Sequence, residues 1–146
     1  MPSHVFHQLY YHIVWGTKNR LPLVAEDMRE RLIRWVEDEC RKRKGTSLAC
    51  NAMPDHVHLF VHLPPTVCVS TFIGQVKGAS SYAYNHHMGA QDELKWQDGY
   101  GVITARKTES EKIIRYITNQ QELHARRETL RVLEATEIKE SLTACP

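Results

Sequence analysis

The sequence lacks the features that mark several common classes of protein. Its four cysteines, Cys40, Cys50, Cys68 and Cys145, form no Cys-x-x-Cys pair, which argues against a zinc ribbon and is typical of reduced thiols in a cytosolic protein. The formal net charge is only +2, so the chain as a whole does not produce the positive field of a general nucleic-acid binder. A nucleic-acid site would have to come from a local cluster of cations.

Membrane and export signals are missing as well. Residues 1–4 carry no basic region of the kind that opens a signal peptide. The segment 56–76 contains no Asp, Glu, Lys or Arg, but it holds three histidines and the pair Pro64-Pro65, which rule against a membrane-spanning helix. We therefore expect a soluble protein of the cytoplasm.

No internal repeat, low-complexity tract or linker divides the chain. A length of 146 residues with 42% hydrophobic content is enough for one domain whose core needs no disulfide. We expect a single domain over residues 1–146, with its core at 6–124 and a helical tail at 125–146.

Residues 53–63 carry the clearest pattern in the chain. After a Pro54-Asp55 turn, apolar residues alternate with a second set that contains three histidines: Val57, Leu59, Val61 and Leu63 against His56, His58, Phe60 and His62. This alternation predicts a strand with all three histidines on one face. At about 3.3 Å per residue, His56 and His58 are about 7 Å apart at Cα and can share a cation, whereas His62 lies about 13 Å beyond His58 and is a poor third ligand. Two half-exposed histidines on a solvated face are an equally good interpretation of these residues alone.

Periodicity and turn signals predict the other elements. Strands are expected at 6–15, 46–53, 56–63 and 102–104, and helices at 25–44, at 70–87 and from 108 onwards. This order is that of an α+β fold of the ferredoxin-like (split βαβ) type, a four-stranded antiparallel sheet with helices on one face, plus C-terminal helices. Ser70 is placed to cap the second helix, and Gly74 and Gly78 within it indicate close packing or the approach of another backbone. The fold itself does not decide the function.

A few basic and aromatic residues are candidates for DNA contacts. The cations lie after the first strand, at the end of the first helix and in the second helix, and the aromatic residues lie in a late loop; the set is Lys18, Arg20, Arg41, Arg43, Lys77, Trp96 and Tyr100. The cations could contact phosphates and the rings could stack on bases. Solvated charges and rings partly buried against the core are the simpler interpretations.

Tyr116 and Gln120 are four residues apart in the third predicted helix, so they lie on one face, one turn from each other. This spacing allows Gln120 to complete a metal site while Tyr116 points at the group that the metal polarises. The residues alone favour a surface helix with a half-buried tyrosine.

Five short motifs, taken together, carry a resemblance to a known family. In chain order they are Tyr11-His12-Ile13-Val14-Trp15 with Lys18-Asn19-Arg20, Met53-Pro54-Asp55-His56-Val57-His58, Lys77-Gly78-Ala79-Ser80-Ser81, Trp96-Gln97-Asp98-Gly99-Tyr100-Gly101 and Tyr116-Ile117-Thr118-Asn119-Gln120. The chain resembles the single-tyrosine HUH transposases of the insertion-sequence 200/605 type, including their relatives associated with repeated extragenic palindromes. The resemblance implies a ferredoxin-like fold that forms a homodimer and acts at the nucleoid of a bacterial-type cytoplasm, on single-stranded DNA that contains hairpins. It also implies that this DNA is cleaved and rejoined through a 5′-phosphotyrosine intermediate.

By position, the resemblance makes Tyr116 the nucleophile and makes His56, His58 and Gln120 the ligands of a divalent cation, Mg²⁺ or Mn²⁺. Ligand softness alone would point two histidines toward zinc, copper or nickel. Many relatives carry a His-His pair where this chain has Leu123-His124, so His124 is given no more than an accessory role. The tyrosine helix is expected in either the same subunit or the partner.

Three other functions remain open from the sequence. A domesticated relative would nick palindromic repeats of the chromosome without moving its own gene. A catalytically silent ferredoxin-like protein would bind nucleic acid only. A zinc hydrolase would need a nearby carboxylate as general base, and the strand alternation predicts that Asp55 faces away from the histidines.

Overall fold

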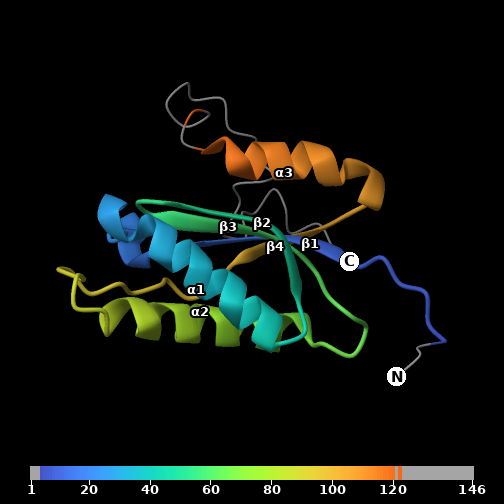
Figure 1. The fold of residues 1–146 in the computed structure, drawn as a ribbon, viewed down its shortest axis with the longest axis horizontal. Coiled ribbons are helices and arrows are strands. Elements are labelled where there is room, and N and C mark those ends of the chain that lie inside the picture. The colour runs from blue at the N-terminus through green and yellow to red at the C-terminus, as the bar shows by residue number, and fades with distance from the viewer. Residues whose placement is uncertain (1–3, 121, 123–146) are drawn as a thin grey trace.

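The computed structural model describes residues 4–120 and 122, and over these residues the chain forms a four-stranded antiparallel sheet with helices on both faces (Figure 1). The elements are β1 (Tyr10–Gly16), η1 (Lys18–Arg20), η2 (Glu26–Met28), α1 (Arg29–Lys42), β2 (Thr46–Met53), β3 (His56–His62), α2 (Val69–Asn85), β4 (Gly101–Ala105), η3 (Lys107–Glu109) and α3 (Ser110–Thr118), where η marks a short 3-10 helix. The strands lie in the order β2-β3-β1-β4. This is the predicted ferredoxin-like topology.

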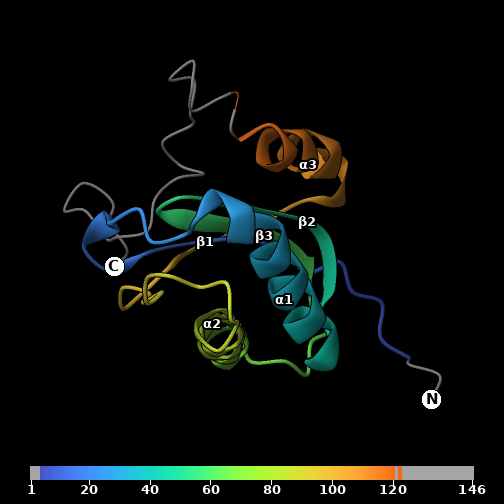
Figure 2. The same ribbon diagram turned by 60° about the vertical axis from the view of Figure 1, so that its left-hand side comes forward.

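The two faces of the sheet are covered by different helices. α1 and α2 lie together on one face and α3 lies on the other, as both ribbon views show (Figures 1 and 2). Side chains from β1 and β3 that alternate along the strands, among them Ile13, Trp15, Val57 and Leu59, form the larger core beneath α1 and α2. Phe60 points the opposite way and packs in a smaller core with residues of α3. The predicted alternation of β3 is therefore confirmed, but the histidine face is covered by a helix and is not solvated.

The central hairpin places the histidines in the middle of the sheet. β2 and β3 are antiparallel, and Met53 is opposite His56 across the Pro54-Asp55 turn. β3 is also paired with β1 on its other side, so its backbone is hydrogen-bonded along both edges. A strand held in this way gives its side chains a fixed direction.

Several predicted boundaries differ from those of the structure. β1 begins at Tyr10 because Tyr10 is opposite His62, the last residue of β3, and earlier residues have no strand to pair with. Ser70 is not the cap of α2: the N-cap is Cys68, and no side chain caps that end. A Cβ atom built at Gly74 or Gly78 would meet no other part of the described chain within 4 Å outside the neighbouring backbone of α2, so the predicted close packing at these glycines is wrong for residues 4–120 and 122.

No helix among the described residues is long and apolar enough to cross a membrane. His124 and the predicted tail at 125–146 lie outside the described residues.

Candidate active site

His56 and His58 are brought together on the face of the sheet that α3 covers. Only 1% of His56 and none of His58 is exposed. The two rings lie nearly perpendicular, with their centroids 5.0 Å apart. Two imidazoles this close, on a strand held from both sides, can contribute a nitrogen each to one bound cation.

Tyr116 is supplied to the same place by α3 of the same chain. The backbone N–H of Arg106 donates to Glu109 at 2.9 Å just before the helix begins, and the buried side of α3 then carries Ile113, Tyr116 and Ile117. The ring of Tyr116 meets that of His58 edge to face, with centroids 6.0 Å apart. The phenol and the imidazole pair therefore lie on one side of the sheet, within one chain.

Gln120 lies one turn beyond Tyr116. The predicted helix is interrupted, because α3 ends at Thr118 and Asn119 forms a turn, but Gln120 itself is again helical. Its side chain is fully buried. Its Nε2 donates to the backbone carbonyl of Tyr116 at 3.0 Å, whereas its Oε1 has no hydrogen-bond partner among the described residues. An unsatisfied buried acceptor costs about 1–3 kcal/mol, so an amide oxygen left in this position is suited to binding a cation or a water molecule.

The metal ligands predicted from the sequence are two imidazoles and one amide. Among the described residues no three His, Cys, Asp or Glu side chains are grouped closely enough to hold a metal ion. Within this part of the chain, a third protein donor beside His56 and His58 would have to be of another residue type, and Gln120 is the one that the sequence predicts. Two imidazole nitrogens and one amide oxygen are acceptable ligands for a divalent cation that keeps several waters.

Asp55 contacts the site, contrary to the prediction that it faces away. Its Oδ1 lies 2.7 Å from Nδ1 of His56, and its Oδ2 accepts a hydrogen bond from Nε of Arg20 at 3.4 Å. The alternation rule failed because Asp55 belongs to the turn and not to the strand. The hydrogen bond from His56, together with the charge of Arg20, lowers the pKa of Asp55. The carboxylate lies on the Nδ1 side of the His56 ring, which places it away from Nε2.

His12 was not identified from the sequence as a site residue. It is buried on β1, and its Nε2 lies 3.0 Å from Nδ1 of His58. The only sequence signal was that His12 alternates with the core residues Ile13 and Trp15 and so must face the other side of the sheet. Its distance from His58 depends on the register between β1 and β3, which local sequence does not specify.

Asn51 was also missed, and it ties α3 to the sheet beside His58. It lies on β2 directly opposite His58. Its Nδ2 donates to the carbonyl of Ile117 at 2.9 Å, and its Oδ1 accepts from Nη1 of Arg29 at 3.0 Å. The last turn of α3, with Tyr116, is thereby held at a fixed place above β3.

Two of the predicted DNA contacts make structural contacts with each other. Nζ of Lys77 donates to the carbonyls of Gln97 at 2.9 Å and Gly99 at 2.7 Å, and burial lowers the pKa of this ammonium group. Nε1 of Trp96 donates to the carbonyl of Lys77 at 3.0 Å, and its ring packs edge-on against Trp15. These bonds anchor the loop before β4 to α2. A DNA-binding role for Lys77 and Trp96 stays a prediction.

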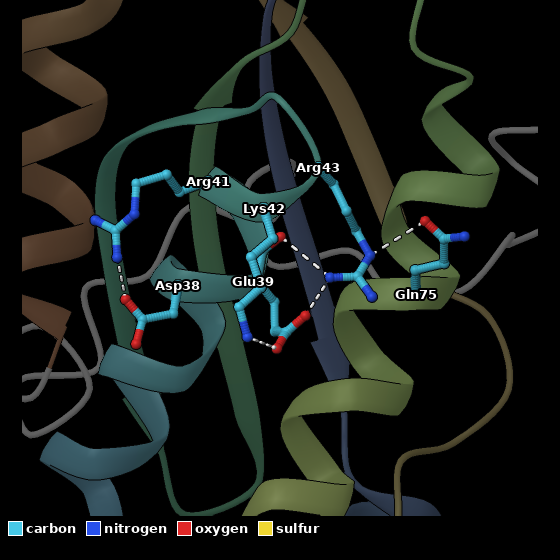
Figure 3. Close-up of polar contacts among 6 residues, drawn as sticks. All are labelled: Asp38, Glu39, Arg41, Lys42, Arg43 and Gln75. Atoms are coloured by element: carbon cyan, nitrogen blue, oxygen red, sulfur yellow. Dashed lines mark hydrogen bonds and ion pairs between the residues drawn. The ribbon is translucent and has the colours of Figure 1, made fainter.

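The remaining predicted cations lie in two places. Arg41 pairs with Asp38 at the end of α1, and Arg43 bonds both Glu39 and Gln75 of α2 (Figure 3). This group is part of the helical layer on the opposite face of the sheet from Tyr116. The short helix η1, which carries Lys18 and Arg20, contacts the turn before His56, because the N–H of Thr17 donates to the carbonyl of Asp55 at 2.9 Å. Tyr100 packs at the edge of the larger core.

The family of the chain follows from its likeness to known proteins. The model of a family described as transposase, IS200 like, matches residues 5–120. The chain belongs to the IS200-like transposase family. The matched range includes Tyr116, His56, His58 and Gln120. The protein is therefore a transposase, an enzyme that acts on DNA.

Individual relatives agree with this assignment. The IS200-like transposase is 31% identical over 120 residues to the transposase for insertion sequence element IS200 of Salmonella typhimurium, over 77% of this chain and 76% of that protein. It is 26% identical over 122 residues to the ISDra2 transposase TnpA of Deinococcus radiodurans, over 78% of this chain and 85% of that one.

Two solved structures are similar in fold. The crystal structure of a putative transposase from Deinococcus radiodurans aligns with a TM-score of 0.62 at 25% identity, over 82% of this chain and 96% of that one. A REP-associated tyrosine transposase bound to a REP hairpin aligns with a TM-score of 0.61 at 16% identity, over 99% of this chain and 95% of that one. At the lower identity the likeness shows the fold alone.

Proposed function

We propose that this IS200-like transposase cleaves and rejoins single-stranded DNA, with Tyr116 as the nucleophile and with His56, His58 and Gln120 as the protein ligands of Mg²⁺ or Mn²⁺. The observation that carries the proposal is that Tyr116 lies against His58, with ring centroids 6.0 Å apart, on the face to which His56 also points. Gln120, whose buried Oε1 has no hydrogen-bond partner among the described residues, lies one turn from Tyr116 and donates to its backbone carbonyl.

The proposed ligands fit a hard divalent cation that is bound weakly until substrate arrives. Three protein donors leave positions for water and for a phosphate oxygen. When bound, the cation would withdraw charge from a non-bridging oxygen of the scissile phosphate, whose own charge otherwise repels a nucleophile. The amide of Gln120 favours Mg²⁺ or Mn²⁺, whereas two imidazoles alone would favour softer ions.

In the cleavage step, the Tyr116 hydroxyl loses its proton to solvent and its oxygen forms a bond to phosphorus. The bond from phosphorus to the 3′ oxygen breaks, and this oxygen takes up a proton to become a free 3′-hydroxyl. The product is a 5′-phosphotyrosine. Because one phosphodiester is exchanged for another, a second 3′-hydroxyl can attack the phosphotyrosine, restore the phenol and rejoin the strand without ATP.

For the substrate we propose single-stranded DNA with hairpins, bound by a homodimer. Of the predicted cations, Lys18 and Arg20 are on η1, whose Arg20 contacts Asp55 in the turn before His56. The exposed ion pair of Arg20 with Asp55 does not prevent a phosphate contact, because pairs of this kind are worth about 0–1 kcal/mol. Binding should weaken with salt at a slope of about −0.7 per neutralised phosphate.

The proposal is tested with purified protein, labelled single-stranded hairpin oligonucleotides and Mn²⁺, followed by denaturing electrophoresis. We expect an SDS-resistant adduct with the wild type, no adduct with Tyr116→Phe, and unchanged adduct formation with the control Tyr82→Phe, which alters an exposed tyrosine of α2. DNA binding should persist in Tyr116→Phe. An adduct that survives in Tyr116→Phe, or that forms in EDTA, would contradict the proposal. A wild type that binds DNA but never forms an adduct would indicate a silent binding protein.

A further inference from the structure

We propose that Asp55 and His12, which are outside the predicted ligand set, are positioning residues that fix the tautomers of His56 and His58. Each holds Nδ1 of one histidine, so that the lone pair of each imidazole is on Nε2, where a metal ion can be bound. This inference rests on the proposed function, because it assigns a purpose to the contacts in terms of the same metal site. A neutral imidazole can coordinate through only one nitrogen, and the nitrogen that carries the proton is set by the hydrogen bond at the other.

For His56 the tautomer follows from the chemistry of its partner. Nδ1 lies 2.7 Å from Oδ1 of Asp55. An ionised carboxylate only accepts hydrogen bonds, so the proton of His56 is on Nδ1. Asp55 is itself held in place, because Arg20 donates to its other oxygen at 3.4 Å and Thr17 N–H donates to its backbone carbonyl at 2.9 Å.

For His58 the geometry allows two arrangements, and only one is compatible with the metal site. Nδ1 of His58 and Nε2 of His12 are 3.0 Å apart, and the ring planes differ by 3° with centroids 5.1 Å apart. Because the nitrogens are much closer than the ring centres, the rings meet edge to edge. If His12 donates, the proton of His58 must be on Nε2 and blocks coordination there. If His58 donates, its lone pair is on Nε2.

The fold gives His12 a fixed position from which to accept this hydrogen bond. On β1, His12 is opposite Phe60 and Val14 is opposite His58, so His12 and His58 are diagonal neighbours on one face, within reach of long side chains. β1 is paired with β3 on one side and with β4 on the other. The two histidines are thus oriented by residues of different elements: Asp55 of the turn orients His56, and His12 of β1 orients His58.

Nitrogen NMR of the wild type without metal gives a readout that is independent of catalysis. Long-range ¹H–¹⁵N spectra distinguish the two neutral tautomers of each imidazole. We expect both His56 and His58 to carry the proton on Nδ1. A proton on Nε2 of either residue would overturn the inference. This measurement needs no substitution, so it decides the question even if a buried variant does not fold.

Metal affinity gives the second readout, measured as free Mn²⁺ by electron paramagnetic resonance in the absence of DNA. We expect His12→Phe and Asp55→Ala each to weaken Mn²⁺ binding by about 10–100-fold, the usual effect of removing a partner of a metal-bound histidine. Asp55→Asn keeps an oxygen that can accept from His56 and should lose less than Asp55→Ala.

The matched control is His62→Phe. His62 is on the same strand and makes the same kind of contact, its Nε2 lying 3.2 Å from Nδ1 of His7, but no Mn²⁺ affinity should be lost. Equal affinity in His12→Phe and the wild type would overturn the inference while the proposed function stands. Nδ1 tautomers in a wild type that does not bind Mn²⁺ even with single-stranded DNA present would support the inference about proton positions and contradict the proposed metal site.

Discussion

Asn51 offers the sharpest test of how α3 is held above the histidines. The change Asn51→Ala removes four hydrogen bonds. Oδ1 accepts from Arg29 at 3.0 Å and from Ala52 N–H at 2.9 Å, and Nδ2 donates to the carbonyl of Ile117 at 2.9 Å and, in a longer and weaker bond, to that of Thr118 at 3.4 Å. Each is worth about 1 kcal/mol net, and buried groups left unsatisfied cost somewhat more. We therefore expect the free energy of unfolding to fall by about 3 kcal/mol.

The assay is urea denaturation followed by circular dichroism, with adduct formation measured in parallel. A loss of about 3 kcal/mol leaves most domains folded, because their stability is typically about 5–15 kcal/mol. Adduct formation should fall more than DNA binding, since α3 carries Tyr116. The control is Ser47→Ala on the same strand, whose hydroxyl donates to Glu37 at 3.2 Å; a half-exposed contact of this kind is worth less than about 1 kcal/mol. A loss below 1 kcal/mol in Asn51→Ala, or one no greater than that in Ser47→Ala, would refute the reasoning.

Three further predictions concern parts of the chain away from the site. Gly74→Ala and Gly78→Ala should each stabilise the protein by about 1 kcal/mol in urea, because alanine is the better helix former and, among the described residues, no atom beyond the neighbouring backbone of α2 lies within 4 Å of the new methyl group. Iodoacetamide should alkylate Cys68 far faster than Cys40 at pH 7. Hydrogen bonding lowers the pKa of the exposed Cys68 thiol to about 7, whereas burial raises the pKa of Cys40 to about 12. Because the thiolate is the form that reacts, the alkylation rate at Cys68 should rise through pH 7 and then level off. Peptide mass spectrometry measures both rates. Lys77→Met should make the loop before β4 more mobile and speed the cleavage of that loop by protease. The reason is that the two hydrogen bonds from Nζ of Lys77 to backbone carbonyls of the loop are lost.

Each of these has a clear contradicting result. Destabilisation by either glycine substitution would mean that the helix face is in contact with something. Equal alkylation of the two cysteines, or a rate at Cys68 that rises only above pH 8, would contradict the lowered pKa. Unchanged protease sensitivity in Lys77→Met would show that Trp96, which bonds the carbonyl of residue 77, is enough to hold the loop.

The elements that could be predicted from the sequence are those defined by a local repeat. β2 spans Thr46–Met53 as expected, and β3 ends one residue early, at His62. The period-2 alternation of β3 is a strong signal because its apolar set packs in the larger hydrophobic core. The convergence of His56 and His58 with Tyr116 was also expected, through spacing and the resemblance to known transposases.

The contacts that were missed or wrong depend on residues distant in sequence or on turns. His12 meets His58 only through the pairing of β1 with β3, and register between distant strands is set by the whole core. Asp55 was assigned the wrong direction because a turn residue does not follow strand alternation.

The central claim is that Tyr116 is the nucleophile of a single metal-dependent site. Digesting the protein–DNA adduct formed in Mn²⁺ and sequencing the modified peptide by mass spectrometry tests it most directly. The account predicts one modified residue, Tyr116, joined to the 5′ phosphate of the cleaved strand, and no modified peptide when Mn²⁺ is withheld. Attachment of the DNA to any other residue, or the same yield without a divalent cation, would contradict it.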